Sequence, residues 1–145
     1  MNAELIFSIV NLIAAIGWSL MILFPRWILT QRVIVNGTLT LILAVVYSLL
    51  IIIFFGNTEG GFGSLAAVHS LFQNSYLLLA GWIHYLAFDL FIGAWQLRDA
   101  QKHQIPHYQL IPVLILTFLF GPVGLLLYFG LRAVRSYRAG ITVQK

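Results

Sequence analysis

The sequence contains no cysteine, and only 8% of its 145 residues carry a formal charge. The absence of cysteine excludes thiol nucleophiles, disulfide bonds, iron–sulfur clusters and cysteine-ligated zinc. Soluble domains carry about 25% charged residues, so the scarcity of charge excludes an ordinary soluble protein. Most basic residues lie singly beside apolar segments, which argues against nucleic acid as a partner.

Apolar side chains are what the chain has in abundance, at 61% of the sequence. This composition predicts an integral membrane protein whose immediate partner is membrane lipid. A membrane-spanning helix uses about 20 apolar residues, so the length accommodates about four spans and no additional folded domain. We therefore expect an all-α fold, a polytopic four-transmembrane-helix bundle with short loops that forms a single domain over residues 1–145.

Four apolar stretches define these predicted spans, at residues 5–24, 33–55, 74–95 and 110–131. Residues 65–72, which include His69, predict a short interfacial helix after a glycine-rich loop. The N-terminus lacks the basic segment and cleavage site of a secretory signal, so the first span is expected to be retained. Four spans place four Lys and Arg residues at each end, so the positive-inside rule leaves the orientation open.

The third span contains two ionisable side chains, His84 and Asp89, and such groups at membrane depth are functional hypotheses by default. Trp82, Tyr85, Asp89 and Gln96 share one helical face, whereas His84 lies about 140° from Asp89. The two ionisable groups flank one cleft if the groove between neighbouring helices falls on the arc that separates them. In the alternative interpretation, His84 hydrogen-bonds a carbonyl and Asp89 pairs with an Arg or Tyr across the bundle.

The fourth span contains Gly121, Pro122 and Gly124 near its midpoint. Pro122 removes a backbone donor, which predicts a bend and a Phe118 carbonyl without its helical partner. The glycines permit close approach of a ligand or of another helix, so the bend predicts either a ligand cleft or tighter packing. The candidate ligand-binding residues of a cleft between the third and fourth spans are Trp82, Phe88, Phe118, Gly121, Pro122 and Gly124.

No metal and no cofactor is expected. His103 and His107 have the spacing of one helical turn, but Pro106 between them disfavours a regular helix and hence a metal site. A bis-histidine haem would need two inward-facing histidines, of which His84 is one and His69 a marginal second. The sequence has no phosphate-binding loop and no nucleotide motif.

The C-terminal half, from about Gly81 to Gly130, contains a distinctive series of short motifs: Trp82-Ile83-His84, Asp89-Leu90-Phe91, His107, and Phe120 with Pro122 and Gly124. In the order and spacing of these motifs the chain resembles the abscisic-acid-deficient-four-like (ABA4-like) family of membrane proteins, which is associated with neoxanthin synthesis. The resemblance implies four spans and a role in xanthophyll metabolism, the conversion of violaxanthin to neoxanthin. That conversion opens an epoxide and forms an allene without net oxidation, so it implies a proton donor and a base but no metal or nucleotide.

On this resemblance, His84 and Asp89 are the catalytic donor and acceptor, and Tyr85 and His107 assist them. The leading hypothesis is a membrane protein that binds and isomerises a carotenoid or related isoprenoid between the third and fourth spans. The absence of a transit peptide indicates a prokaryotic plasma membrane, or a thylakoid in a phototroph. Partners beyond the lipid and this ligand are a second copy of the chain or another membrane protein.

Two other interpretations remain open from the sequence. In the first, the protein is a non-catalytic subunit or scaffold, in which the same polar residues hold helices together. In the second, it is a small redox protein that holds haem or a quinone. Visible absorbance of the purified protein separates these interpretations from the isomerase hypothesis.

Overall fold

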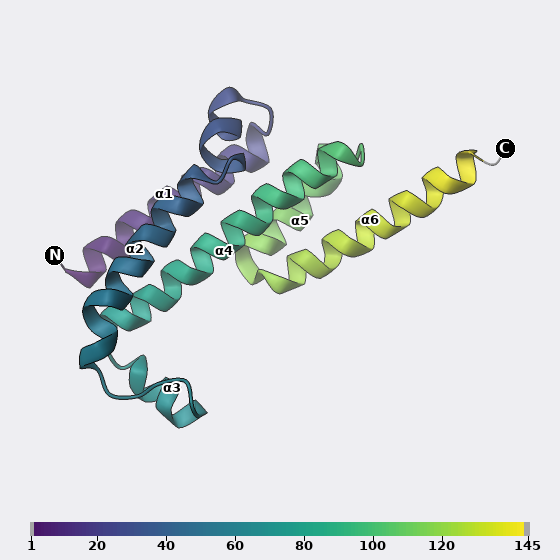
Figure 1. The fold of residues 1–145 in the computed structure, drawn as a ribbon. Helices are drawn as coiled ribbons and strands as arrows, with labels where there is room; N and C mark the ends of the chain where they lie inside the picture. Colours follow the sequence, from purple (N-terminus) through teal and green to yellow (C-terminus); the bar gives the residue numbers. More distant parts are fainter. Residues whose placement is uncertain (1, 144–145) are drawn as a thin grey trace.

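The computed structural model describes residues 2–143, and this part of the chain is helical with no strands (Figure 1). The α-helices are α1 (Ala3–Leu23), α2 (Thr38–Phe54), α3 (Leu65–Leu71), α4 (Ser75–Lys102), α5 (His107–Phe120) and α6 (Pro122–Val143). A π-helical turn, η1 (Thr30–Val35), precedes α2, and a 3₁₀ turn, η2 (Phe55–Asn57), follows it. The predicted all-α fold is confirmed.

The central element is α4, which packs against α1, α2 and α5. Asn74 caps its N-terminus by accepting hydrogen bonds from the backbone N–H groups of Tyr76 and Leu77. Trp18 of α1 lies over Gly93 of α4, where an added Cβ would be 2.6 Å from the indole ring. Glycine is therefore required at this position for α1 to approach α4 this closely.

The first three predicted spans correspond to α1, α2 and α4, with two differences at their ends. The second helix begins at Thr38 and not at residue 33, because Gly37 has a left-handed backbone (φ 85°) between η1 and α2. The third helix continues past residue 95 to Lys102, so the polar segment after Trp95 is helical. The short helix predicted over residues 65–72 is α3.

The prediction of one bent helix over residues 110–131 is wrong, because the chain reverses at Gly121. Gly121 has φ 32° and ψ −88°, and α6 runs back along α5 from Pro122 (Figure 1). Gly124 lies directly against the backbone of Thr117, and Arg135 hydrogen-bonds Gln109, so the pairing is that of an antiparallel helical hairpin. A left-handed glycine followed by proline, which has no N–H to donate, ends a helix and does not merely bend it.

By length and composition, α1 and α4 are long and apolar enough to cross a membrane. The apolar helices α2 and α5 are shorter, at 17 and 14 residues. Two of the described helices thus meet the length requirement for a span, and the predicted count of four is not confirmed.

Candidate functional site

A polar stripe runs along the face of α4 that meets the α5–α6 hairpin. Its members recur at helical spacing, so they lie within one narrow arc of the helix surface. They are Tyr85, Asp89, Gln96 and Asp99. Asp89 and Gln96 are among the few polar residues buried in the core. The hairpin therefore covers polar groups that would otherwise face an apolar environment.

Tyr85 lies opposite the point where Pro122 interrupts the hydrogen-bonding pattern. The Tyr85 hydroxyl donates a hydrogen bond of 2.8 Å to the carbonyl oxygen of Phe118. This is the carbonyl that an amide N–H at position 122 would have bonded in a continuous helix. The sequence predicted that this acceptor would need a partner, and the partner is a side chain on α4.

Asp89 lies against the turn of the hairpin. A Cβ added to Gly121 would be 2.6 Å from Asp89 Oδ1, so only glycine leaves room for the carboxyl group. Gly121 immediately precedes α6, and the N-terminus of a helix is the positive end of its dipole. Asp89 Oδ2 is buried and has no hydrogen-bond partner among the described residues. The carboxyl group therefore has one oxygen free to accept a hydrogen bond.

Gly124 allows α6 to come into close contact with Thr117 of α5. The Thr117 hydroxyl lies 3.0 Å from Gln96 Oε1 and 2.9 Å from the Val113 carbonyl oxygen. The sequence allows either a ligand or another helix beside Gly121 and Gly124, and in the structure this space is occupied by Asp89 and Thr117. What the two glycines permit in this structure is contact between protein groups.

His84 points in a different direction from Asp89, toward α2. Its ring lies 4.5 Å from the ring of Phe88 and 5.6 Å from that of Tyr47. It lines a pocket of about 270 Å³ whose other walls are mostly apolar side chains of α2, α3 and α4. The structure therefore does not bring His84 and Asp89 together, although each contacts a separate group of predicted site residues.

Trp82 lines a larger pocket, of about 540 Å³, between the N-terminal ends of α1 and α4. Its indole N–H donates a hydrogen bond of 3.0 Å to Asn11 Oδ1 of α1. The lining includes one ionisable side chain, Glu4, which gives no functional signal in the sequence because Glu is ordinary in the first turn of a helix. Phe72 and Gly81 belong to both pockets, and the Phe72 ring lies 3.1 Å from a Cβ added to Gly81.

The other predicted site residues are His107 and Phe88, and their side chains make contacts elsewhere than at Asp89. His107 starts α5, and its Nε2 donates a hydrogen bond of 2.8 Å to the carbonyl oxygen of Ile22 at the end of α1. Phe88 is 59% exposed and contacts His84. No group of three or more His, Asp and Glu side chains in residues 2–143 is arranged to hold a metal ion.

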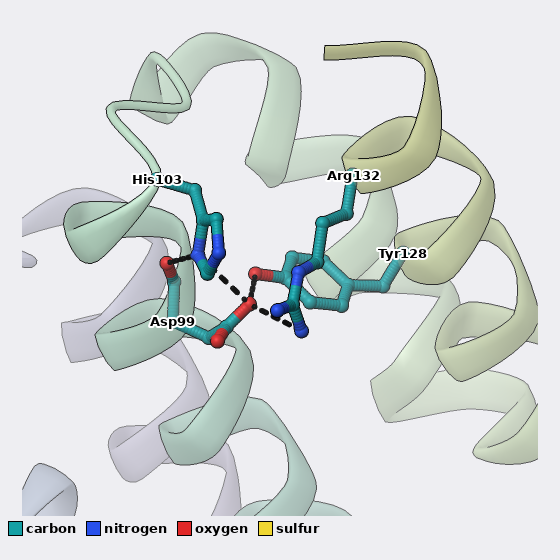
Figure 2. Close-up of polar contacts among 4 residues, drawn as sticks. All are labelled: Asp99, His103, Tyr128 and Arg132. Atoms are coloured by element: carbon teal, nitrogen blue, oxygen red, sulfur yellow. Dashed lines mark hydrogen bonds and ion pairs between the residues drawn. The ribbon is translucent and has the colours of Figure 1, made fainter. Parts of the chain in front are cut away.

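A second polar cluster joins the C-terminal end of α4 to α6 (Figure 2). Asp99 Oδ2 accepts a hydrogen bond of 2.6 Å from the hydroxyl of Tyr128, which is fully buried. The same oxygen lies 3.3 Å from an Arg132 guanidinium nitrogen and 3.4 Å from His103 Nδ1. His103 Nδ1 also donates to the backbone carbonyl of Asp99, at 2.9 Å. One carboxylate thus connects three side chains from two helices.

Sequence reasoning missed this cluster because it placed Asp99 and Arg132 at opposite ends of the bundle. The only signal in the sequence is the adjacency of Gly121 and Pro122, since a full reversal there returns residue 132 to the level of residue 99. The spacing from the turn is consistent with this: Gly121 meets Asp89, and Arg132 meets Asp99.

The comparisons with known proteins agree with the resemblance found in the sequence. A family model described as ABA DEFICIENT 4-like matches residues 5–128. No curated protein and no solved structure matches the chain significantly. The matched segment includes the Tyr85–Phe118 hydrogen bond, Asp89 and the reversal at Gly121, and it covers most of the chain. The chain therefore belongs to the ABA4-like family, which is associated with neoxanthin synthesis.

Proposed function

We propose that this chain is a multi-pass membrane protein that binds a carotenoid or related isoprenoid. The observation that supports this most directly is the pair of mainly apolar pockets on either side of the N-terminal half of α4. Their volumes are about 540 and 270 Å³, near the range of small-molecule sites in proteins. Phe72 borders both pockets over Gly81, so displacement of this ring would join them into one elongated site.

The same geometry supports acid–base chemistry on the bound isoprenoid. His84 lies on the wall of the smaller pocket, and an imidazole can serve as a general acid or a general base. Asp89 is the second candidate: it is one helical turn from Tyr85, whose ring lies 5.3 Å from that of Trp82 on the larger pocket. An isomerisation needs one proton added and one removed, with no oxidant.

The experiment is expression in a carotenoid-producing host, purification, and analysis of the extracted pigment. We expect the wild-type protein to retain a polyene. We expect Gly81→Leu, which fills the space between the pockets, to lose it, and Gly130→Leu, at a glycine with open space around it, to keep it. His84→Gln should retain pigment but abolish its chemical change. A wild-type protein without pigment, or equal retention by both leucine variants, contradicts the proposal.

A scaffold role is the second candidate function, and it is favoured by the contacts of Tyr85 and Asp89 with the hairpin. In that role the two side chains hold α5 and α6 against α4. It predicts that substitutions of Asp89 lower the stability or the yield of a complex while any pigment profile stays unchanged.

A further inference from the structure

The positively charged side chains that the structure describes are gathered at one end of the molecule, which we call the basic end. Arg26 follows α1, and Arg32 lies in η1 before α2. The Arg98 guanidinium donates a hydrogen bond of 3.0 Å to the carbonyl oxygen of Val35, which brings the C-terminal part of α4 to the same end. A single pocket is lined by Arg26, residues near the end of α4 and the start of α5, which confirms that these segments meet.

The hairpin returns α6 to this end. Arg132 pairs with Asp99 near the end of α4, and Arg135 bonds Gln109 near the start of α5. The basic end is therefore formed by Arg26, Arg32, Arg98, Lys102, Arg132 and Arg135. The even division of charge expected from four spans does not hold for this arrangement, because that count placed α6 at the opposite end.

The opposite end, formed by the N-terminus of α1, the glycine-rich loop and α3, is acidic. It has Glu4 and Glu59 but no Lys or Arg among the described residues. Biological membranes carry anionic lipids mainly on the leaflet where basic residues of membrane proteins also concentrate. A molecule with charge divided in this way has an electrostatically preferred orientation.

The hairpin reaches only part of the way from the basic end to the acidic end. Its turn meets Asp89, which is in the middle of α4. A helix of 14 residues such as α5 is about 21 Å long, against a hydrocarbon core of about 30 Å. Both ends of the hairpin are thus at the basic end, as in a re-entrant segment whose turn is buried in protein.

Of these six basic side chains, three bond to other parts of the protein and three make no hydrogen bond or ion pair with a described residue. Arg98, Arg132 and Arg135 bond groups of other helices. Arg26, Arg32 and Lys102 are exposed and make no hydrogen bond or ion pair within residues 2–143. The neighbours of Arg26 are exposed apolar residues, with Trp27 50% and Ile28 58% exposed. Cations beside exposed aromatic and aliphatic groups are typical of the lipid headgroup region.

From this arrangement we propose that the basic end binds the headgroups of anionic phospholipids, and that α5 and α6 form a re-entrant hairpin anchored at that surface. The inference rests on the proposed membrane location. It also selects lipid over an acidic protein or nucleic acid, because Arg26 borders exposed aromatic and aliphatic side chains. Arg26, Arg32 and Lys102 supply the attraction, since each basic residue near an anionic surface contributes about 1 kcal/mol.

The first test is native mass spectrometry of the detergent-purified chain with equal amounts of phosphatidylglycerol and phosphatidylcholine. We expect phosphatidylglycerol adducts to predominate. The preference should fall about fivefold for each cation removed in R26Q, R32Q and K102Q, and should not change in the control E4Q/E59Q. A wild-type ratio near one, as expected if an acidic protein were the true partner, or an equal loss in the control, overturns the proposal.

The second test is cysteine labelling. The chain has no cysteine of its own, so each introduced cysteine is the single site that a maleimide can label. In sealed membranes, Gln101→Cys in the last turn of α4 and Ser136→Cys in α6 should react with an impermeant maleimide from the same side. Ser64→Cys before α3 should react from the other side. Labelling of positions 101 and 136 from opposite sides overturns the re-entrant hairpin, even where the chain is membrane-embedded. Extraction of the chain by alkaline carbonate would instead contradict the membrane location itself.

Discussion

The hydroxyl of Tyr85 on α4 bonds the one carbonyl of α5, that of Phe118, whose helical partner is removed by Pro122. The bond joins the centre of α4 to the last turn of α5. A backbone acceptor in an apolar environment without a partner is costly, so the tyrosine allows a proline to stand at this depth. The reversal of the chain is thus supported by a side chain more than thirty residues away.

Tyr85→Phe should therefore destabilise the protein. The substitution keeps the ring and leaves the Phe118 carbonyl without its donor, at a cost of about 1–3 kcal/mol. Thermal unfolding in detergent measures the effect. Tyr137→Phe is the matched control, because Tyr137 is 73% exposed, and its unfolding temperature should not change. Equal stability of the two variants would mean that the hydrogen bond is not needed at the turn.

The close contact of α5 and α6 makes a second prediction, at two glycines of the same helix. A Cβ at Gly124 would overlap the backbone of Thr117, whereas a Cβ at Gly130 would meet nothing within 4 Å. Gly124→Ala should lower stability by about 1–3 kcal/mol because the hairpin must separate. Gly130→Ala should be neutral or should stabilise by up to about 1 kcal/mol, since alanine is the better helix former.

Thermal unfolding of these two variants separates packing from helix propensity. If α5 and α6 formed one continuous helix, positions 117 and 124 would not face each other, and both substitutions would have the same favourable sign. Opposite signs are expected from the hairpin.

The helices were largely predictable from the sequence, because apolar runs and a glycine-rich break are local signals. Those signals predicted the positions of α1, the greater part of α2, α3 and most of α4. The reversal was not predictable in this way, because Gly121-Pro122 is compatible with a bend in a membrane helix as well as with a turn. The angle depends on what packs against the turn, here Asp89 and Tyr85.

Prediction of the candidate site from the sequence was limited for the same reason. Helical spacing placed Trp82, Tyr85 and Asp89 on one face, and the structure has Tyr85 and Asp89 meeting the same hairpin. Whether His84 shares a cleft with Asp89 depended on which arc of α4 each neighbouring helix covers, and spacing contains no such information. His84 faces α2, and Asp89 faces the turn before α6.

The Asp99 cluster provides a third prediction, in which a buried bond and an exposed ion pair compete for one carboxylate. Tyr128→Phe removes a short hydrogen bond from a fully buried tyrosine to a charged acceptor, which contributes about 1.5–3 kcal/mol. Arg132→Gln removes an ion pair whose arginine side chain is 34% exposed, and such pairs contribute less than about 1 kcal/mol.

Chemical or thermal unfolding should therefore rank Tyr128→Phe well below Arg132→Gln in stability. A larger loss from Arg132→Gln would indicate that the ion pair, and not the hydroxyl, holds α6 to α4. Added salt is a further check, because it should weaken the exposed pair and leave the buried hydrogen bond largely unchanged.

Asp89 separates the two proposed functions. Its Oδ2 atom is buried without a partner among the described residues, and such a group lowers the stability of a fold. Groups kept at a cost to stability are typical of functional sites. If Asp89 serves the reaction, Asp89→Asn should abolish any change in the bound pigment while raising stability, or leaving it unchanged, in thermal unfolding. If Asp89 is a scaffold contact with Gly121, the same variant should lose about 1–3 kcal/mol of stability and leave the pigment profile intact. Because the two hypotheses predict different outcomes in two independent measurements, pigment change and stability, one variant decides between them.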